Sequence, residues 1–394
     1  MLVQKNVQLG QKRSCIRELF EHGLRQAAVV GKENVFDFSI GNPSVPAPAE
    51  VAQAFHDLTD PSLDSLSIHG YTTAMGDADA REAIAADLRQ RYDFPVQASN
   101  IFMTCGAAPA LTAVFHALAV EGAEVVVNAP YFAEYRPFVE GAGMKFVTVP
   151  ADYETFQINF PALEQALNPH TQAVIVNSPN NPSGVIYSRE VLTRLAALLE
   201  EKSREYGHPI YIVSDEPYRE LVYDGAEVPF LPAIYPDTVI CYSYSKSFSL
   251  PGERIGYVLV NDRATDSAEL YAAVAGSARA LGHVCAPSLM QKVVGRCAHV
   301  RPNIEVYDLN RKTLHQALQD YGYQCVKPQG AFYLMIKAPG GSGKAFSDRA
   351  KAENLLLVPC DDFGVPEYVR ASTCVSHEMV LKSLPVFKKL IEEA

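Results

Sequence analysis

The stretch DTVICYSYSKSFSLPGERIGYVLVND, residues 237–262, places a polar segment between two apolar runs. Both runs are rich in β-branched and aromatic residues, as is typical of strands that are buried on both faces. The segment between them holds one lysine, Lys246, among four serines, followed by Pro-Gly and Arg254. A serine-rich loop with a lysine is usually a solvated surface loop. Between two buried strands of an α/β protein, however, such a loop commonly binds a ligand.

Further apolar runs precede this stretch and alternate with helical patterns. They are AEVVVNA (123–129), QAVIVNS (172–178) and PIYIVSD (209–215). SREVLTRLAALLEEKSREYG predicts a helix that ends at Gly207, and GAAPALTAVFHALAV predicts a buried helix that is too short to span a bilayer. Alternating strands and helices imply right-handed crossovers and a mostly parallel sheet flanked by helices. The fold class is therefore α/β.

The pattern changes after about residue 290. VYDLNRKTLHQALQDYG predicts a helix, QCVKPQGAFYLMIKA and EYVRASTCVS predict strands, and HEMVLKSLPVFKKLIEEA predicts a closing helix. We expect a large cofactor-binding domain at 46–290 and a smaller α+β domain formed by 1–45 and 291–394. A chain of 394 residues is long enough for two such cores.

Composition excludes several classes of function. The net charge of −11 argues against nucleic acid as the main partner. The eight cysteines form no CxxC pair, so no metal site is indicated, and scattered thiols fit a reducing cytosol. The N-terminal residues contain no apolar run of signal-peptide length. We therefore expect a cytoplasmic protein that binds small molecules, without a membrane partner.

Polar residues follow several predicted strands at the edge where α/β proteins bind ligands. The segments are NSPNNPSG (177–184), SDEPY (214–218), YSYSK (242–246) and the glycine turn TCGAAPAL (104–111). Each segment alone has a structural explanation as a turn or a helix cap. Together they supply a lysine for a Schiff base, a carboxylate for a pyridinium nitrogen and a helix N-terminus for a phosphate. These are the groups that pyridoxal 5′-phosphate requires.

Taken in order, these motifs resemble the class I/II aminotransferases of the aspartate aminotransferase superfamily, fold type I. GYTTAMGDADAREAIA, APYFAEY, QGAFY and YVRAS complete the resemblance, which covers nearly the whole chain. It implies a sheet of the seven-stranded type and pyridoxal phosphate as cofactor. In this resemblance Lys246 matches the lysine that forms the Schiff base and carries the proton, and Asp215 matches the partner of the ring nitrogen. Tyr218 and Asn181 match the groups that bind the phenolic oxygen.

The resemblance also implies a phosphate site and a substrate site. Arg254, Ser243 and Ser245 match the phosphate clamp, which Ala107 and Ala108 after Gly106 would complete with backbone N–H groups. Many relatives carry a side-chain donor in that turn, which this chain lacks. Phosphate binding here is therefore expected to depend more on Arg254 and the two serines. The remaining matches are Phe132 stacking on the ring (with Tyr131 as the alternative), Arg370 and Gly41 at the substrate α-carboxylate, and Tyr71 reaching the phosphate of a partner subunit, which implies a homodimer.

The leading hypothesis is an aminotransferase that moves an amino group between an L-amino acid and a 2-oxo acid. A carbon–sulfur β-lyase uses the same cofactor residues and remains the alternative. A non-catalytic effector-binding domain of a transcription regulator is disfavoured, because the chain has no basic N-terminal module. Arg279 is the candidate for a cation that would bind a distal carboxylate, although a helix-surface arginine explains it better. We therefore expect neutral amino acids to be better substrates than aspartate.

Overall fold

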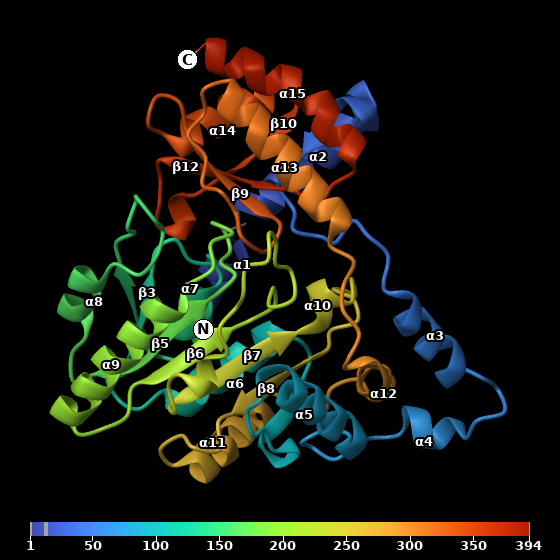
Figure 1. Cartoon of the computed structure of the whole chain (residues 1–394), viewed down its shortest axis with the longest axis vertical. Coiled ribbons are helices and arrows are strands. Elements are labelled where there is room, and N and C mark those ends of the chain that lie inside the picture. Colours follow the sequence, from blue (N-terminus) through green and yellow to red (C-terminus); the bar gives the residue numbers. More distant parts are fainter. Residues whose placement is uncertain (1, 12–14, 394) are drawn as a thin grey trace.

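The computed structural model describes residues 2–11 and 15–393. A seven-stranded sheet lies at the centre of the larger part of the molecule, and a three-stranded sheet with its helices lies above it (Figure 1). The large sheet has the order β2-β8-β7-β6-β5-β3-β4. Its strands are β2 Ile101–Thr104, β3 Glu124–Asn128, β4 Lys145–Val149, β5 Thr171–Asn177, β6 Tyr211–Asp215, β7 Thr238–Ser243 and β8 Gly256–Val260. The predicted α/β fold class is confirmed.

Helices cover both faces of the large sheet, which is why its strands are almost continuously apolar. Along β3, Val125 and Val127 pack in a core with α6, whereas Val126 packs in a core with α9 on the other face. The α-helices that precede or surround this sheet are α3 Ala49–Leu58, α4 Ser65–His69, α5 Ala78–Tyr92, α6 Ala107–Leu118, α7 Tyr135–Gly141, α8 Phe160–Ala166, α9 Arg189–Tyr206, α10 Tyr244–Ser247, α11 Ser267–Ala280 and α12 Ser288–Cys297. As predicted, Gly207 caps α9 in the left-handed conformation.

One strand departs from the parallel arrangement. β8 pairs antiparallel with both of its neighbours, β7 and β2. Its start therefore lies at the same edge of the sheet as the ends of β7 and β2, and Gly256 pairs with both Ser243 and Thr104. This reversal places the segment before β8, which contains Arg254, beside the segments that follow β7 and β2.

The smaller part combines the end of the chain with its beginning. β12 Tyr368–Ser372 lies between β11 Val358–Pro359 and β9 Tyr333–Lys337 in an antiparallel sheet, and β1 Phe36–Asp37 pairs parallel with β10 Leu355–Leu356. The accompanying helices are α1 Gln4–Gln11, α2 Cys15–Val30, α13 Glu305–Asp320, α14 Gly343–Ala352 and α15 His377–Glu392. The strand predicted over QCVKPQGAFYLMIKA is shorter than expected, because only its last part pairs regularly.

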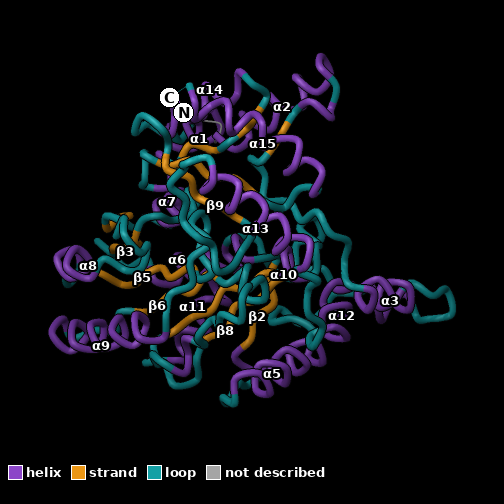
Figure 2. Tube along the Cα trace, turned by 45° about the horizontal axis from the view of Figure 1, so that its top comes forward, coloured by secondary structure: helices purple, strands orange, loops and turns teal. Residues whose placement is uncertain are grey.

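Two further features bear on function. α3 and the loop toward α4 stand out from one side of the molecule in both views (Figures 1 and 2). The polar segment after β7 is not wholly a loop, since Tyr244–Ser247 forms one helical turn that Ser243 caps through its side chain. Across residues 2–11 and 15–393, no helix is long and apolar enough to cross a membrane.

Candidate active site

A cavity of about 290 Å³ lies at the edge where β5, β6, β7 and β2 end, beneath the smaller sheet. Segments from both parts of the molecule line it. Its walls are Ile16, Gly41, Ala107, Ala108, Leu111, Phe132, Phe138, Asn181, Asp215, Pro217, Tyr218, Ser243, Ser245, Lys246, Pro251, Arg254, Tyr333 and Arg370. The fold thus brings together all of the site residues predicted from the sequence except Gly106, which adjoins the cavity, and Tyr71.

Lys246 extends from α10 into this cavity. Its Nζ donates a hydrogen bond of 2.6 Å to the backbone oxygen of Gly41 and lies 5.6 Å from the ring centroid of Phe332. Burial, together with the nearby cations Arg254 and Arg370, lowers the pKa of Lys246 from 10.5 to about 8. Near physiological pH a lysine with such a pKa is neutral far more often than an ordinary lysine, and the neutral amine is the form that acts as a nucleophile or a base.

Asp215 ends β6 and is only 5 % exposed. Its Oδ2 accepts a hydrogen bond of 2.5 Å from the hydroxyl of Tyr135, whereas its Oδ1 has no hydrogen-bond partner among the described residues. Burial raises the pKa of this carboxyl from 3.8 to about 7, although the Tyr135 hydrogen bond opposes the rise. A buried acceptor without a partner is costly. A protonated ring nitrogen would supply the hydrogen-bond donor that Oδ1 of Asp215 lacks.

A candidate anion site lies beside the lysine. Nη1 of Arg254 donates a hydrogen bond of 3.2 Å to Oγ of Ser245, which lies 2.8 Å from Oγ of Ser243. The N-terminus of α6 reaches the same place through Ala107, where the free backbone N–H groups favour an anion. Gly106 has φ of +94°, and a Cβ there would lie 2.5 Å from Nη2 of Arg254, so this turn requires glycine.

The cavity wall also holds a buried arginine. Arg370 is only 1 % exposed, and it donates hydrogen bonds of 3.0 Å to Oδ1 of Asn181 and 2.7 Å to the backbone oxygen of Ser39. Its Nε finds no partner within the described part of the chain. A buried guanidinium with unused donor capacity suits a carboxylate ligand, which it binds through two parallel hydrogen bonds.

Two predicted positions lie outside the cavity. Tyr71 is 99 % exposed, on the segment that follows α4. Arg279 is exposed near the end of α11 and does not belong to the cavity wall. A single chain therefore does not bring Tyr71 to its own site.

Sequence reasoning missed two tyrosines that the structure places here. Tyr135 holds Asp215, and Tyr333 lies between Tyr218 and Arg370. Each belongs to a motif that was recognised: Tyr135 follows Phe132 by three residues in APYFAEY, and Tyr333 ends QGAFY. The two motifs could have indicated that these tyrosines lie near the site. The direction of each side chain, however, depends on packing between distant segments.

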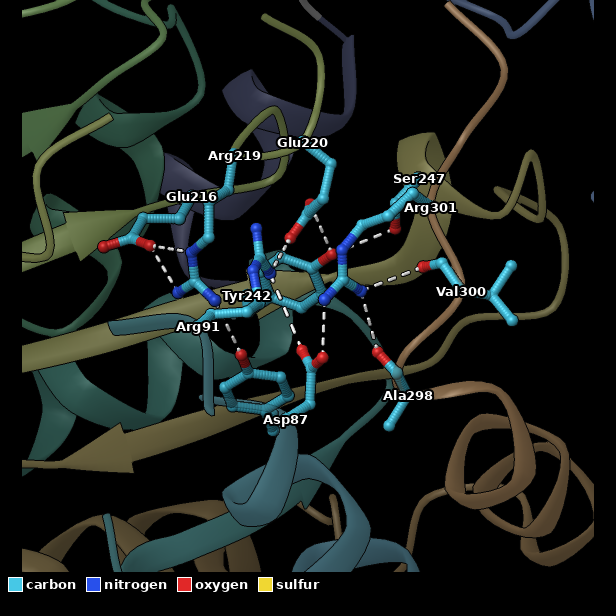
Figure 3. Close-up of polar contacts among 11 residues, drawn as sticks. Asp87, Arg91, Glu216, Arg219, Glu220, Tyr242, Ser247, Ala298, Val300 and Arg301 are labelled. Carbon is cyan, nitrogen blue, oxygen red and sulfur yellow. Dashed lines mark hydrogen bonds and ion pairs between the residues drawn. The ribbon is translucent and has the colours of Figure 1, made fainter. Parts of the chain in front are cut away.

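An ionic cluster extends from the buried pair of Glu216 and Arg219 to the exposed Arg301 (Figure 3). It consists of Asp87, Arg91, Glu216, Arg219, Glu220 and Arg301, so three carboxylates balance three guanidinium groups. Arg219 pairs with Glu216, and Arg91 lies 2.9 Å from Glu220. The hydroxyl of Tyr242 connects Glu220 (2.7 Å) with Ser247 (2.9 Å).

The cluster contacts the segments that carry Asp215 and Lys246. Glu216 is the neighbour of Asp215, and Ser247 is the neighbour of Lys246. Removing one partner of a buried ion pair typically costs about 3–5 kcal/mol. The cluster therefore holds the segment after β6 against the segment after β7.

Comparison with known proteins agrees with this geometry. A protein family described as "Aminotransferase class I and II" matches residues 33–384. Aspartate aminotransferase of Streptomyces avermitilis is 29 % identical over 378 residues, covering 91 % of this chain and 90 % of that protein. Aspartate/prephenate aminotransferase of Thermus thermophilus is 32 % identical over 343 residues, covering 82 % and 84 %.

Solved structures are also similar. An aminotransferase from Eubacterium rectale superposes with a TM-score of 0.98 at 52 % identity, covering 100 % of this chain and 99 % of that one. Aspartate aminotransferase from Thermotoga maritima superposes with a TM-score of 0.85 at 27 % identity, covering 97 % and 98 %. Nothing in these comparisons favours a lyase. The chain belongs to the class I and II aminotransferase family, whose members use pyridoxal phosphate, and it is an enzyme that transfers amino groups.

Proposed function

We propose that this chain binds pyridoxal 5′-phosphate and moves an amino group between an L-amino acid and a 2-oxo acid. One observation carries the proposal: the cavity that holds Lys246, with its lowered pKa, also holds the buried Asp215, whose Oδ1 no described residue pairs with. A basic amine and an unpaired carboxylate oxygen facing one cavity fit this cofactor.

The residues present fit each part of the cofactor. When bound, pyridoxal phosphate supplies an aldehyde carbon and a ring that accepts electrons. Asp215 would hold the ring nitrogen in its protonated form, and Arg254 with the serines and the start of α6 would bind the phosphate. Tyr218 and Asn181 would donate to the phenolic oxygen, and Phe132 would lie against the ring. Lys246 would take the α-proton of the substrate and return it at the neighbouring carbon.

Substrate orientation would come from Arg370 and Gly41. The guanidinium would bind the α-carboxylate through two hydrogen bonds, and the backbone at Gly41 allows a close approach. Lys246 and Arg370 line the same cavity, so a substrate held by its carboxylate would present its α-carbon to the amine. Such positioning accounts for a large part of the rate in enzymes of this kind.

We further propose that neutral amino acids are the preferred donors. Lys246, Arg254 and Arg370 are the cations that line the described part of the cavity, and each has a role above. The remaining wall includes Ile16, Leu111 and Phe138, which are apolar. Although several relatives are named aspartate aminotransferases, a distal carboxylate would lie here without a cation.

Three measurements test these proposals. Borohydride reduction of the cofactor-loaded enzyme followed by peptide mapping should place the phosphopyridoxyl group on Lys246, and a label on another lysine would refute the assignment. With 2-oxoglutarate as acceptor, kcat/KM should be higher for alanine, methionine or phenylalanine than for aspartate, on the order of ten-fold. Preference for aspartate that is lost in Arg279→Ala would overturn the substrate proposal. Pyruvate and ammonia released from an S-alkyl cysteine without an acceptor would favour the lyase.

A homodimer with shared active sites is proposed as well. The projecting segment between α3 and Tyr71 exposes apolar side chains, including Leu66 at 82 % and Tyr71 at 99 %. A second copy that covers this segment would bring Tyr71 to its phosphate site. Light scattering should give the mass of a dimer. The Tyr71→Phe variant should remain a dimer but bind the cofactor more weakly. A fully active monomer at assay concentration would refute this proposal.

The domain boundaries and the cytoplasmic location also remain proposals. The large sheet lies within the proposed domain 46–290, and the pairing of β1 with β10 supports joining 1–45 to 291–394. α12 packs on α3 and α5, which favours ending the large domain after Cys297. All eight cysteines are free, as in a reducing compartment. Limited proteolysis in the connection 298–304 and cell fractionation would test these two points.

A further inference from the structure

Tyr333 contacts two residues of the proposed site, Tyr218 and Arg370, and has no function in the proposal so far. It begins β9, is 3 % exposed and lines the cavity. Its hydroxyl lies 3.0 Å from the hydroxyl of Tyr218, and its ring lies 4.4 Å from the guanidinium carbon of Arg370. One side chain thus joins the proposed donor to the phenolic oxygen with the proposed carboxylate-binding arginine.

The main chain is shaped around this tyrosine. A Cβ at position 41 would collide with the Tyr333 hydroxyl, so the close approach of the two segments requires Gly41. The backbone oxygen of Gly41 in turn accepts the hydrogen bond from Lys246. The Tyr333 hydroxyl therefore lies against the segment that holds the catalytic amine.

The pair of hydroxyl groups imposes an order on its protons. Each phenol carries one proton, and in the cofactor-free chain either oxygen can be the donor. When Tyr218 donates its proton to a group in the cavity, the pair survives only if Tyr333 donates to Tyr218. A phenol oxygen that accepts a hydrogen bond is a better donor through its own proton, because hydrogen bonds in a chain polarise one another.

We propose that Tyr333 is a positioning residue with two separable functions. Its hydroxyl donates to Tyr218, so that the proton of Tyr218 points into the cavity. Its ring supports the face of Arg370 and holds the guanidinium in the plane that receives the substrate carboxylate. This inference rests on the proposed function of the cavity.

Two substitutions separate the functions. Tyr333→Phe keeps the ring and removes the hydroxyl, whereas Tyr333→Leu also removes the ring. Tyr235→Phe is the matched control, because Tyr235 is as deeply buried and its hydroxyl bonds to the backbone oxygen of Ile210 and to Ser203, outside the cavity. Each protein is loaded with pyridoxal phosphate, and its visible absorbance is titrated with pH. Binding of 2-methylalanine, which lacks an α-proton, is measured by the absorbance change.

The expected results differ between the variants. A hydrogen-bond donor favours the more negatively charged form of its acceptor, here the phenolic oxygen of the cofactor. Tyr333→Phe weakens the hydrogen bond that Tyr218 donates to this oxygen, so the pH midpoint of the absorbance titration should rise by about one unit. Its kcat should fall by on the order of ten-fold while the Kd for 2-methylalanine changes little. In Tyr333→Leu that Kd should also rise on the order of ten-fold. Tyr235→Phe should match the wild type in midpoint and Kd.

Failure of the inference is distinguishable from failure of the proposed function. If the wild type neither takes up pyridoxal phosphate nor transfers amino groups, the proposed function is wrong. If the wild type does both, an unchanged absorbance midpoint in Tyr333→Phe overturns the role of the hydroxyl. Equal Kd values for Tyr333→Phe and Tyr333→Leu overturn the role of the ring.

Discussion

Replacing Asp215 by Asn should stabilise the cofactor-free protein relative to the wild type, increasingly as the pH rises from about 4 to about 7. Burial raises the pKa of Asp215 from 3.8 to about 7 in the folded chain. At ~1.4 kcal/mol per pH unit, this rise corresponds to about 4 kcal/mol between the two protonation states. Asn cannot ionise, yet it can still accept the hydrogen bond from Tyr135.

The direction follows from proton binding. Below pH 3.8 the carboxyl is protonated in both states, and between 3.8 and about 7 only the unfolded chain releases its proton. Wild-type stability therefore falls through this range and levels off above it. Between about pH 5 and about pH 9, the wild type should lose about 3 kcal/mol relative to Asp215→Asn.

Urea unfolding of the cofactor-free proteins at several pH values provides the measurement. Asp262→Asn, which removes an exposed carboxylate from the loop after β8, is the control and should show no such pH-dependent difference. Loading with pyridoxal phosphate should shrink the effect, because an ionised Asp215 then has a cationic partner, and the loaded variant should be severely impaired in turnover. Parallel pH profiles for wild type and Asp215→Asn would refute the claim that burial keeps this carboxyl neutral.

Three further predictions address the surroundings. In the cofactor-free protein, competitive acetylation should show Lys246 titrating near its lowered pKa of about 8, and a midpoint at the ordinary value of 10.5 would contradict the burial argument. Gly106→Ala should fold but bind pyridoxal phosphate on the order of ten-fold more weakly, because its Cβ crowds Arg254 and its φ is strained; unchanged affinity would show that the turn yields. Glu220→Gln should lower the free energy of unfolding by about 2 kcal/mol, since it removes the closer of the two carboxylates that pair with Arg91 and leaves Asp87 at 3.7 Å. The control Glu82→Gln breaks an exposed pair and should cost less than about 1 kcal/mol, so equal losses would refute the importance of the ionic cluster.

Much of the fold could be predicted because its signals are local. Continuous apolar runs identified β3, β5, β6, β7 and β8, and the helical patterns identified α9, with its C-cap Gly207, and α15. The family motifs also placed Lys246, Asp215 and Arg370, which the fold brings to one cavity. The helical turn of α10 was missed, because one turn is too short to show a periodic pattern and Ser243 caps it within a segment that resembles a loop.

What the sequence by itself determined is the chemical inventory: which strands and helices form, which polar residues follow them, and the family to which the chain belongs. Only the tertiary structure decided that β8 runs antiparallel, which carries Arg254 to the same edge as Ser243. Residue alternation has the same period in parallel and antiparallel strands, so the sequence pattern does not contain this direction. The tertiary structure likewise placed Tyr135 on Asp215 and Tyr333 between Tyr218 and Arg370. The contact of Tyr135 with Asp215 joins residues 80 apart along the chain within the large part, and that of Tyr218 with Tyr333 joins residues 115 apart across the two parts. Both contacts arise from tertiary packing rather than from any local preference.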